Sequence, residues 1–408
     1  MSTPEDVLLR AMAAHDAGRL TEAEVGYNRV LRKRPTDHQA LYGLGVLSFH
    51  AGARERGIEF MTRSLQSAAG HARGWIALGS MYLATGHAAQ AKAAYVKATE
   101  VSPDLSDGWF NVGLCLQREG DVDAAAEQFR KAIACAVPSS GAFGALSALY
   151  AEQGRLSESA QTVAEWARRE PDHPIAAHMA AAASQGETPA RASDAYVRIL
   201  FDSLAEAFDR NLGGLKYRAP ELVANALHAA AATRGHVPQS SQAVPPFSAV
   251  LDAGCGTGLC GPRVRALCRT LVGVDLSPNM LAQAKRRGCY DELVNAELVA
   301  FMRARPAAFD AIVCADTLVY FGDLAEALSA ARDALKKAGP LIFTVETLAR
   351  DDGTDHRLGF SGRYAHSATY LRRVLAATGF EMQSIEREAL RQERGSAAEG
   401  YVVRAQSL

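Results

Sequence analysis

LDAGCGTG, residues 251–258, is the stretch that decides the fold of the C-terminal half of this chain. An apolar run leads into it and GPRVRAL follows, so a strand passes through a glycine turn into a helix. The three glycines permit positive φ angles and a close approach of the backbone to a ligand. Asp275 ends the next strand, 17 residues after Gly258, where a carboxylate can accept both hydroxyls of a ribose. The stretch therefore predicts a nucleoside-binding turn.

Strand and helix patterns keep alternating after this turn. Apolar strand patterns recur at 309–321 and 339–348, and a helical pattern at 323–338 separates them. Such alternation predicts a parallel sheet that is covered by helices on both faces. The last two apolar segments, 380–391 and 394–406, read as strands joined in a hairpin.

The N-terminal half repeats with a period of 34 residues, over about residues 4–171. Large residues recur at this spacing, as do small ones. Examples are Trp75, Trp109 and Phe143, and Gly79 and Gly113. Each of five copies reads as a helix, a short turn and a helix, in which small residues allow close helix crossings and aromatic residues fill the gaps. The pattern predicts a right-handed superhelical array, closed by a short capping helix at 174–184.

The overall composition excludes several classes of protein. The 44 Lys and Arg residues balance 45 Asp and Glu residues, so the chain lacks the charge of a nonspecific nucleic-acid or anionic-membrane binder. No apolar run reaches membrane-spanning length, and the acidic start is unlike a signal peptide, which predicts a cytoplasmic protein. The seven cysteines and eleven histidines show no chelating spacing, so we expect reduced thiols and no metal site.

Two punctuated segments divide the chain. Gly and Pro interrupt the helical pattern at 185–191, and a second loop, TRGHVPQSSQAVPP, spans 233–246. We therefore predict three parts: the repeat array at 1–184, a helical lid and linker at 190–245, and the sheet domain at 246–408.

Both halves resemble known families. The 34-residue copies resemble the tetratricopeptide repeat (TPR), and the D-x-G-x-G-x-G string with a wound sheet and terminal hairpin resembles class I S-adenosylmethionine-dependent methyltransferases. The two together resemble a bacterial group of TPR-containing methyltransferases. The resemblance implies an all-α TPR solenoid followed by a Rossmann-like domain, with a seven-stranded, mostly parallel sheet ending in a β-hairpin. It also implies the donor S-adenosyl-L-methionine, the product S-adenosyl-L-homocysteine, and no metal.

The resemblance also suggests donor-binding residues. An apolar residue at the place of Met280 packs on the adenine in such enzymes, and an acid at the place of Glu297 lies beside its amino group. The full set of candidates comprises Asp252, Gly254, Cys255, Gly256, Gly258, Asp275, Leu276, Ser277, Met280, Glu297, Leu298, Asp316 and Thr317.

Candidates for the acceptor side come from loops at the carboxyl ends of strands. We predict His366, Asp316 and Tyr320 as catalytic residues, and Arg363, Tyr364 and Glu346 as substrate contacts. His366 is the most plausible base because its ordinary pKa is near 6.5; alternatively, His366 and Ser367 cap the helix that begins at Ala368. Arg363 either holds a substrate carboxylate or forms a structural salt bridge. The helical segment at 196–217 is expected to act as a lid over the donor.

Several functions are compatible with these patterns. The array recruits a protein acceptor or another partner, or it mediates self-association of an enzyme that methylates a small molecule. A noncatalytic scaffold that binds the donor is a third possibility. Gly256, Gly258 and Gly261 also satisfy the G-x-G-x-x-G pattern of NAD(P)-dependent oxidoreductases, but Gly254 directly after the strand favours the methyltransferase.

Overall fold

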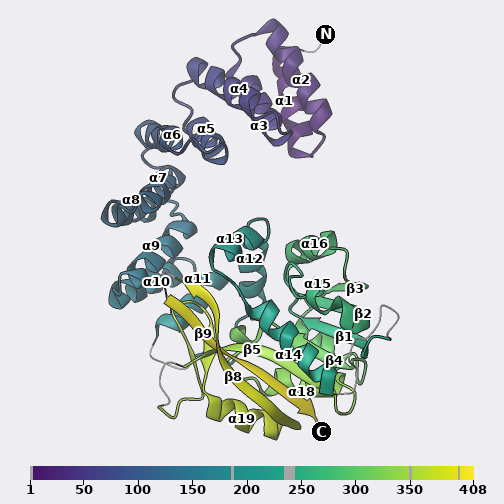
Figure 1. Cartoon of the computed structure of the whole chain (residues 1–408). Helices are drawn as coiled ribbons and strands as arrows, with labels where there is room; N and C mark the ends of the chain where they lie inside the picture. Colours follow the sequence, from purple (N-terminus) through teal and green to yellow (C-terminus); the bar gives the residue numbers. More distant parts are fainter. Residues whose placement is uncertain (1–2, 185–187, 234–243, 349–351, 394–395) are drawn as a thin grey trace. The chain divides into compact units, whose positions relative to one another are not determined.

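The computed structural model describes residues 3–184, 188–233, 244–348, 352–393 and 396–408 (Figure 1). Contacts divide the chain into two compact units, Met1–Trp166 and Ala167–Leu408. Parts of the predicted linker and loop, 185–187 and 234–243, lie outside the described residues, as do the first two residues of the predicted last strand, 394–395.

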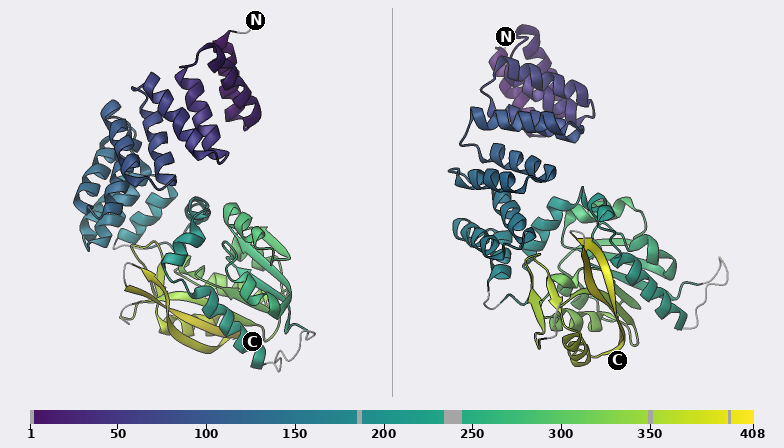
Figure 2. Two further views of the ribbon diagram at one scale, coloured as in Figure 1. Left: turned by 45° about the horizontal axis from the view of Figure 1, so that its top comes forward. Right: turned by 60° about the vertical axis from the view of Figure 1, so that its left-hand side comes forward.

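The first unit consists of paired helices that stack one pair on the next (Figure 2). In each pair, a glycine with positive φ follows the first helix within two residues, at positions 18, 52, 86, 120 and 154, which repeat the predicted 34-residue period. The helices are α1 (Pro4–Asp16), α2 (Leu20–Lys33), α3 (His38–His50), α4 (Arg54–Ser67), α5 (Ala72–Ala84), α6 (Ala88–Val101), α7 (Ser106–Glu119), α8 (Val122–Ala134), α9 (Ser140–Glu152) and α10 (Leu156–Arg169).

Matched side chains hold these pairs together. A Cβ added to Gly79 would lie 2.5 Å from the Tyr95 ring, and one added to Gly113 would lie 2.5 Å from the Phe129 ring. The indole N–H groups of Trp75 and Trp109 each donate to a backbone carbonyl six residues earlier, at 2.8 and 2.7 Å. The repeated aromatic residues thus serve the fold of the array, as their spacing predicts.

Helix α11 (Pro174–Ala183), predicted to cap the array, is instead grouped with the second unit. It packs on α12 (Asp194–Leu204), and Ala182 lies in an apolar cluster with Leu358 and Tyr364. The division between the two compact units falls near Trp166, within α10. The array boundary at residue 184 stays a prediction. An Ala-rich helix buries a small apolar face equally well against either neighbour, so its sequence pattern does not reveal its partner.

The second unit is built on one mixed sheet. The parallel strands lie in the order β3-β2-β1-β4-β5, β9 pairs antiparallel with β5, and β8 pairs with β9. Two short strands, β6 and β7, extend the sheet beyond the end of β5: β7 pairs with β5, and β6 pairs with β7. The sequence did not predict them, because a strand of three residues is too short to show a period. The strands are β1 (Phe247–Ala253), β2 (Cys268–Asp275), β3 (Glu292–Asn295), β4 (Ala311–Cys314), β5 (Pro340–Thr347), β6 (His356–Leu358), β7 (Tyr364–His366), β8 (Phe380–Glu393) and β9 (Ser396–Ser407).

Helices cover both faces of this sheet (Figure 1). Successive residues of β1 point to opposite sides: Leu251 joins the cluster with α12 and α17 to α19, whereas Val250 joins the cluster with α14 and α15. The helices are α13 (Phe208–Gly214), α14 (Ala219–Thr233), α15 (Gly261–Val264), α16 (Pro278–Arg286), α17 (Leu298–Arg303), α18 (Ala325–Ala334) and α19 (Ala368–Ala377). Within the described ranges, no helix combines the length and apolar character needed to span a membrane.

Candidate functional site

Several predicted site residues lie where the strand order reverses. Strand β1 has β2 on one side and β4 on the other, and the chain moves outward in both directions from it. Such a switch point leaves a crevice at the carboxyl ends of the strands, where ligands bind in open α/β sheets. The glycine turn follows β1, Asp275 ends β2, Asp316 follows β4 and Glu346 lies near the end of β5.

Backbone hydrogen bonds fix the glycine turn to strand β2. The N–H groups of Gly254 and Cys255 both donate to the Val274 carbonyl, at 2.9 and 3.0 Å. The Gly256 N–H donates to Asp275 Oδ2 at 2.8 Å, and the Ser277 N–H donates to Asp275 Oδ1 at 2.8 Å. The Asp275 carboxylate therefore joins the two loops that follow β1 and β2.

The three glycines of the turn have different surroundings, although all have positive φ. A Cβ at Gly254 would meet the Thr317 hydroxyl at 2.2 Å, and one at Gly258 would meet the Tyr290 ring at 2.9 Å. A Cβ at Gly256 would meet no atom within 4 Å. Gly256 is therefore the position in this turn where open space lies directly against the backbone.

Of the two acids next to the turn, Asp252 is buried and Asp275 is half-buried. Burial raises the pKa of Asp275, against the lowering effect of the N–H groups of Ser277 and Gly256. Burial also raises the pKa of Asp252 to about 7, although the Tyr290 hydroxyl donates to its Oδ2 at 2.6 Å. Both carboxyls thus lie in a poorly hydrated environment in which a hydrogen bond is worth more than in water.

Helices α12 and α13, in the segment predicted to be a lid, contact the loops after β1 and β2 through two further acids. The Ser277 hydroxyl donates to Asp202 of α12 at 2.5 Å, and the Thr257 hydroxyl donates to Asp209 of α13 at 2.6 Å. Arg287 also pairs with Asp209. The segment predicted as a lid therefore lies directly against the glycine turn.

The predicted adenine-side residues are engaged within the protein. Met280 is fully buried and its N–H donates to Ser277 Oγ, so Ser277 caps α16. Glu297 caps α17 by accepting the Ala300 N–H at 2.7 Å, and its other oxygen pairs with Arg191 at 3.1 Å. The contact of Met280 and Glu297 with an adenine remains a prediction. Leu276, beside them, is half-buried, and Leu298 and Cys255 are buried.

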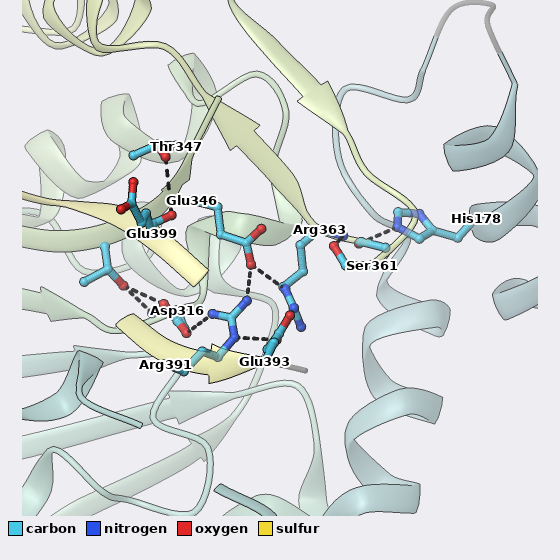
Figure 3. A network of polar contacts seen from close by, with 11 residues as sticks. His178, Asp316, Glu346, Thr347, Ser361, Arg363, Arg391, Glu393 and Glu399 are labelled. Carbon is cyan, nitrogen blue, oxygen red and sulfur yellow. Dashed lines mark hydrogen bonds and ion pairs between the residues drawn. The ribbon is translucent and has the colours of Figure 1, made fainter. Parts of the chain in front are cut away.

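A second group of charged residues lies at the carboxyl ends of β4 and β5 (Figure 3). We call it the Arg391 cluster; it contains Asp316, Glu346, Arg363, Arg391 and Glu393. Arg391, whose side chain is 4% exposed, donates to Asp316 at 3.0 Å, to Glu393 at 2.6 Å and to Glu346. Arg363 donates to Glu346 and Glu393, both at 2.6 Å. Of the two alternatives for Arg363, this geometry matches the salt bridge.

No sequence pattern indicated Arg391, Glu393 or Tyr290 as site residues. Arg391 contacts Asp316 across 75 residues and lies in a strand rich in charges, whose pattern resembles a solvated edge. No local spacing marks such a contact in advance. Arg391 lies on β8, which pairs with β9, the antiparallel neighbour of β5, and this strand order is known only from the fold.

The predicted base His366 lies in the interior. Its ring is buried, its Nε2 donates to the Gly322 carbonyl at 3.1 Å, and burial lowers its pKa to about 4. Its ring neighbours are His356 and Tyr370, which are not members of the Arg391 cluster. This buried environment of His366 does not favour the protonated ring, so it does not favour a role as the base that takes a proton from a bound acceptor. Ser367 does cap α19.

The two predicted tyrosines are also buried. Tyr364 donates its hydroxyl to the Pro189 carbonyl at 2.6 Å, and burial raises the pKa of Tyr320 to about 12. Both hydroxyls therefore stay protonated at neutral pH. Their catalytic and substrate-binding roles remain predictions.

The burial of His366 predicts a pH effect on stability. An unfolded histidine titrates near 6.5, so the folded state, with its pKa of about 4, loses stability as pH falls from 6.5 toward 4. We expect wild type to lose about 2 kcal/mol more than His366→Gln between pH 7.5 and pH 5 in urea unfolding. His50→Gln, at an exposed position, serves as control. An equal loss in wild type and His366→Gln would contradict the burial argument.

Comparison with known proteins agrees with this arrangement. A family model described as a methyltransferase domain matches residues 251–341, and one described as a tetratricopeptide repeat matches residues 8–72 and 76–140. The chain carries tetratricopeptide repeats and a methyltransferase domain. The fold, a helical repeat array before a mostly parallel sheet, is the one that the sequence predicts.

Three relatives show partial similarity. Methyltransferase-like protein 27 of Homo sapiens is 39% identical over 97 residues, covering 23% of this chain and 34% of that protein. A ubiquinone biosynthesis O-methyltransferase of Thiobacillus denitrificans is 32% identical over 102 residues, covering 23% of this chain and 43% of that protein. Cellulose synthase operon protein C of Xanthomonas axonopodis is 34% identical over 168 residues, covering 38% of this chain and 11% of that protein. The chain therefore spans less than half the length of each relative.

Solved structures resemble each half at low identity. Magnesium protoporphyrin IX methyltransferase from Synechocystis, solved with bound S-adenosylhomocysteine, aligns with a TM-score of 0.40 and 17% identity, covering 53% of this chain and 99% of that one. A TPR protein, YrrB, aligns with a TM-score of 0.36 and 19% identity, covering 43% and 91%.

Proposed function

We propose that the protein is a class I S-adenosyl-L-methionine-dependent methyltransferase that releases S-adenosyl-L-homocysteine. The observation that carries this proposal is the open space against Gly256, beside the half-buried Asp275 carboxylate at the switch point of the sheet. A glycine turn with room for a ligand, next to an acid at the end of β2, suits a nucleoside with a polar tail.

The residues around the turn fit such a donor. Asp275 accepts two backbone N–H groups, and a carboxylate has further lone pairs with which to accept the ribose hydroxyls. The backbone of Gly254 to Gly256 and the Thr317 side chain would face the amino-acid end. The chemistry that the bound donor supplies is a sulfonium methyl group open to in-line displacement. The adenosine end would be flanked by Leu276, Met280, Glu297 and Leu298.

The acceptor side is assigned to the Arg391 cluster. It lies at the carboxyl ends of β4 and β5, and Thr317, next to Asp316, donates to the Gly254 carbonyl at 3.3 Å. Alignment of the acceptor with the methyl group is the main task of such a site. We propose that Asp316, Glu346 and Arg363 form its polar wall, and that Tyr320, Tyr364 and His366 shape the surrounding interior.

We propose that the repeat array, 1–184, recruits an acceptor or partner protein or mediates self-association, and that 190–245 acts as a lid on the catalytic domain, 246–408. A protein acceptor and a small-molecule acceptor both suit this arrangement. We propose neither nucleic acid nor a membrane as a partner. Among the residues that the structure describes, no cluster of three or more His, Cys, Asp or Glu side chains has metal-binding geometry.

Calorimetric titration of the full chain tests this proposal. We expect S-adenosylmethionine and S-adenosylhomocysteine each to bind at one site, and NADH and NADPH to give no heat. Binding of a nicotinamide nucleotide without S-adenosylhomocysteine would support the oxidoreductase alternative instead. Donor binding with no methyl transfer to any acceptor would support the noncatalytic scaffold.

Gly256→Ala is expected to weaken S-adenosylhomocysteine binding at least tenfold, because the new methyl group enters the open space against the turn. The positive φ of +54° adds a folding cost of about 1–2 kcal/mol. Gly120→Ala is the matched control: its φ of +83° is strained in the same way and it also has no neighbour within 4 Å, but it lies in the array. An affinity equal to that of wild type in the Gly256 variant would refute the placement of the donor.

A further inference from the structure

Tyr290, which precedes β3, packs behind the glycine turn. A Cβ added at Gly258, Gly261 or Gly273 would lie 2.9, 2.8 or 3.0 Å from its ring. Gly258 and Gly261 come from the turn and from the start of α15, whereas Gly273 lies in β2. Three glycines of two separate segments thus make room for one aromatic ring.

The tyrosine is also anchored at both ends. Its hydroxyl donates to Asp252 Oδ2 at 2.6 Å, and Asp252 is 1% exposed in β1, where it pairs in register with Gly273. The next residue, Asp291, donates its N–H to the Leu271 carbonyl at 2.9 Å and accepts the Leu271 N–H at 2.7 Å. The ring is therefore held between β1, β2 and the turn.

We propose that Tyr290 is a positioning residue of the donor site: its ring sets the shape of the glycine turn, and its hydroxyl fixes the Asp252 carboxylate under that turn. This inference rests on the proposed function, because the turn is assigned to the donor. It also explains the glycine pattern. Gly256 leaves space for the ligand, whereas Gly258 and Gly261 leave space for Tyr290.

Tyr290 and Asp252 would act on donor binding by holding the glycine turn rigid. A binding turn holds its N–H groups in the productive direction only if the residues behind it are locked by packing and hydrogen bonds. Removal of the hydroxyl alone leaves the ring in place, so Tyr290→Phe retains the packing and loses the bond to Asp252. The effect of that loss on the turn must pass through Asp252, which makes the two residues energetically coupled.

A double-mutant cycle on the full chain tests the proposal. The probe is S-adenosylhomocysteine, titrated by calorimetry into wild type, Tyr290→Phe, Asp252→Ala and the double variant, with urea unfolding measured in parallel. We expect each single variant to weaken binding about tenfold, within the range of coupled neighbours in one hydrogen-bond network, and the double variant to be no weaker than Asp252→Ala. Tyr370→Phe is the matched control, since its buried hydroxyl also donates to an aspartate, Asp323, at 3.0 Å. It should leave the affinity unchanged.

The outcomes are distinct. The positioning role would be overturned if Tyr290→Phe bound S-adenosylhomocysteine as tightly as wild type. It would also be overturned if the affinity losses of the two single variants multiplied in the double variant. Either result would leave the proposed function standing. Loss of affinity in Tyr370→Phe as well would show that any lost hydroxyl loosens the domain, which also overturns it. Wild type that does not bind S-adenosylhomocysteine would overturn the proposed function, and this inference with it.

Discussion

Replacement of Asp275 by alanine is expected to weaken S-adenosylhomocysteine binding by roughly 10- to 100-fold, equivalent to about 1.5–3 kcal/mol for hydrogen bonds to a charged group. The carboxylate has two tasks in this account. It would accept the ribose hydroxyls, and it accepts the N–H groups of Gly256 and Ser277, which hold the loops after β1 and β2 together. Calorimetric titration of the purified full chain measures the change directly.

Asp310→Ala is the matched control for this experiment. Asp310 also accepts a backbone N–H of the central strands, that of Ala249 at 2.8 Å, and pairs with Lys336. It lies near the start of β1, away from the glycine turn, so its loss affects stability and leaves donor affinity intact. An Asp275 variant that binds as tightly as the Asp310 variant would refute the ribose assignment.

Replacement of Arg391 by methionine is expected to destabilise the second unit by about 3–5 kcal/mol, the usual cost of removing one partner from a buried ion pair. Arg391 is the shared donor to Asp316, Glu346 and Glu393. Without it, three carboxylates face one another with only Arg363 to balance them. Methionine fills a volume similar to that of arginine, so the loss of stability reflects the missing charge more than missing packing.

Arg387→Met provides the comparison on the same strand. Its side chain is 59% exposed and pairs with Glu399 at the surface, where such pairs contribute about 0–1 kcal/mol. Urea unfolding followed by far-UV circular dichroism measures both variants. Tryptophan fluorescence, from Trp75, Trp109 and Trp166, reports the first unit in parallel. A difference of less than about 1 kcal/mol between the two variants would contradict the description of Arg391 as the centre of a buried cluster.

Local patterns in the sequence were sufficient to predict the elements that position the site. The strand, glycine turn and helix at 247–264 are specified by neighbouring residues, and so is the repeated positive-φ glycine that follows the first helix of each repeat. Asp275 could be predicted to face the turn because the ends of adjacent parallel strands meet at one edge. The hydrogen bond from Gly256 to Asp275 is the result of that rule.

The remaining contacts depend on the tertiary fold. Tyr290 contacts Asp252 across 38 residues, and Arg391 contacts Glu346 across 45, with no pattern to connect them. The ordinary histidine pKa that makes His366 a candidate base applies to a solvated ring, and the burial of His366 is visible only in the structure. Met280 has the helical position expected for an adenine contact and its side chain is fully buried; the adenine contact itself stays a prediction.

The central claim, that this chain transfers a methyl group from S-adenosylmethionine, is tested most directly by donor carrying a tritiated methyl group. The full chain, its Asp275→Ala variant and its Asp310→Ala variant are each added to lysate from cells that lack the protein, and label is counted in macromolecules and small metabolites. The account predicts transfer by wild type and Asp310→Ala, and little by Asp275→Ala. Label on protein would favour recruitment by the array, and label on metabolites would favour its role in assembly. No enzyme-dependent label in either fraction, or equal label from all three proteins, would contradict the account.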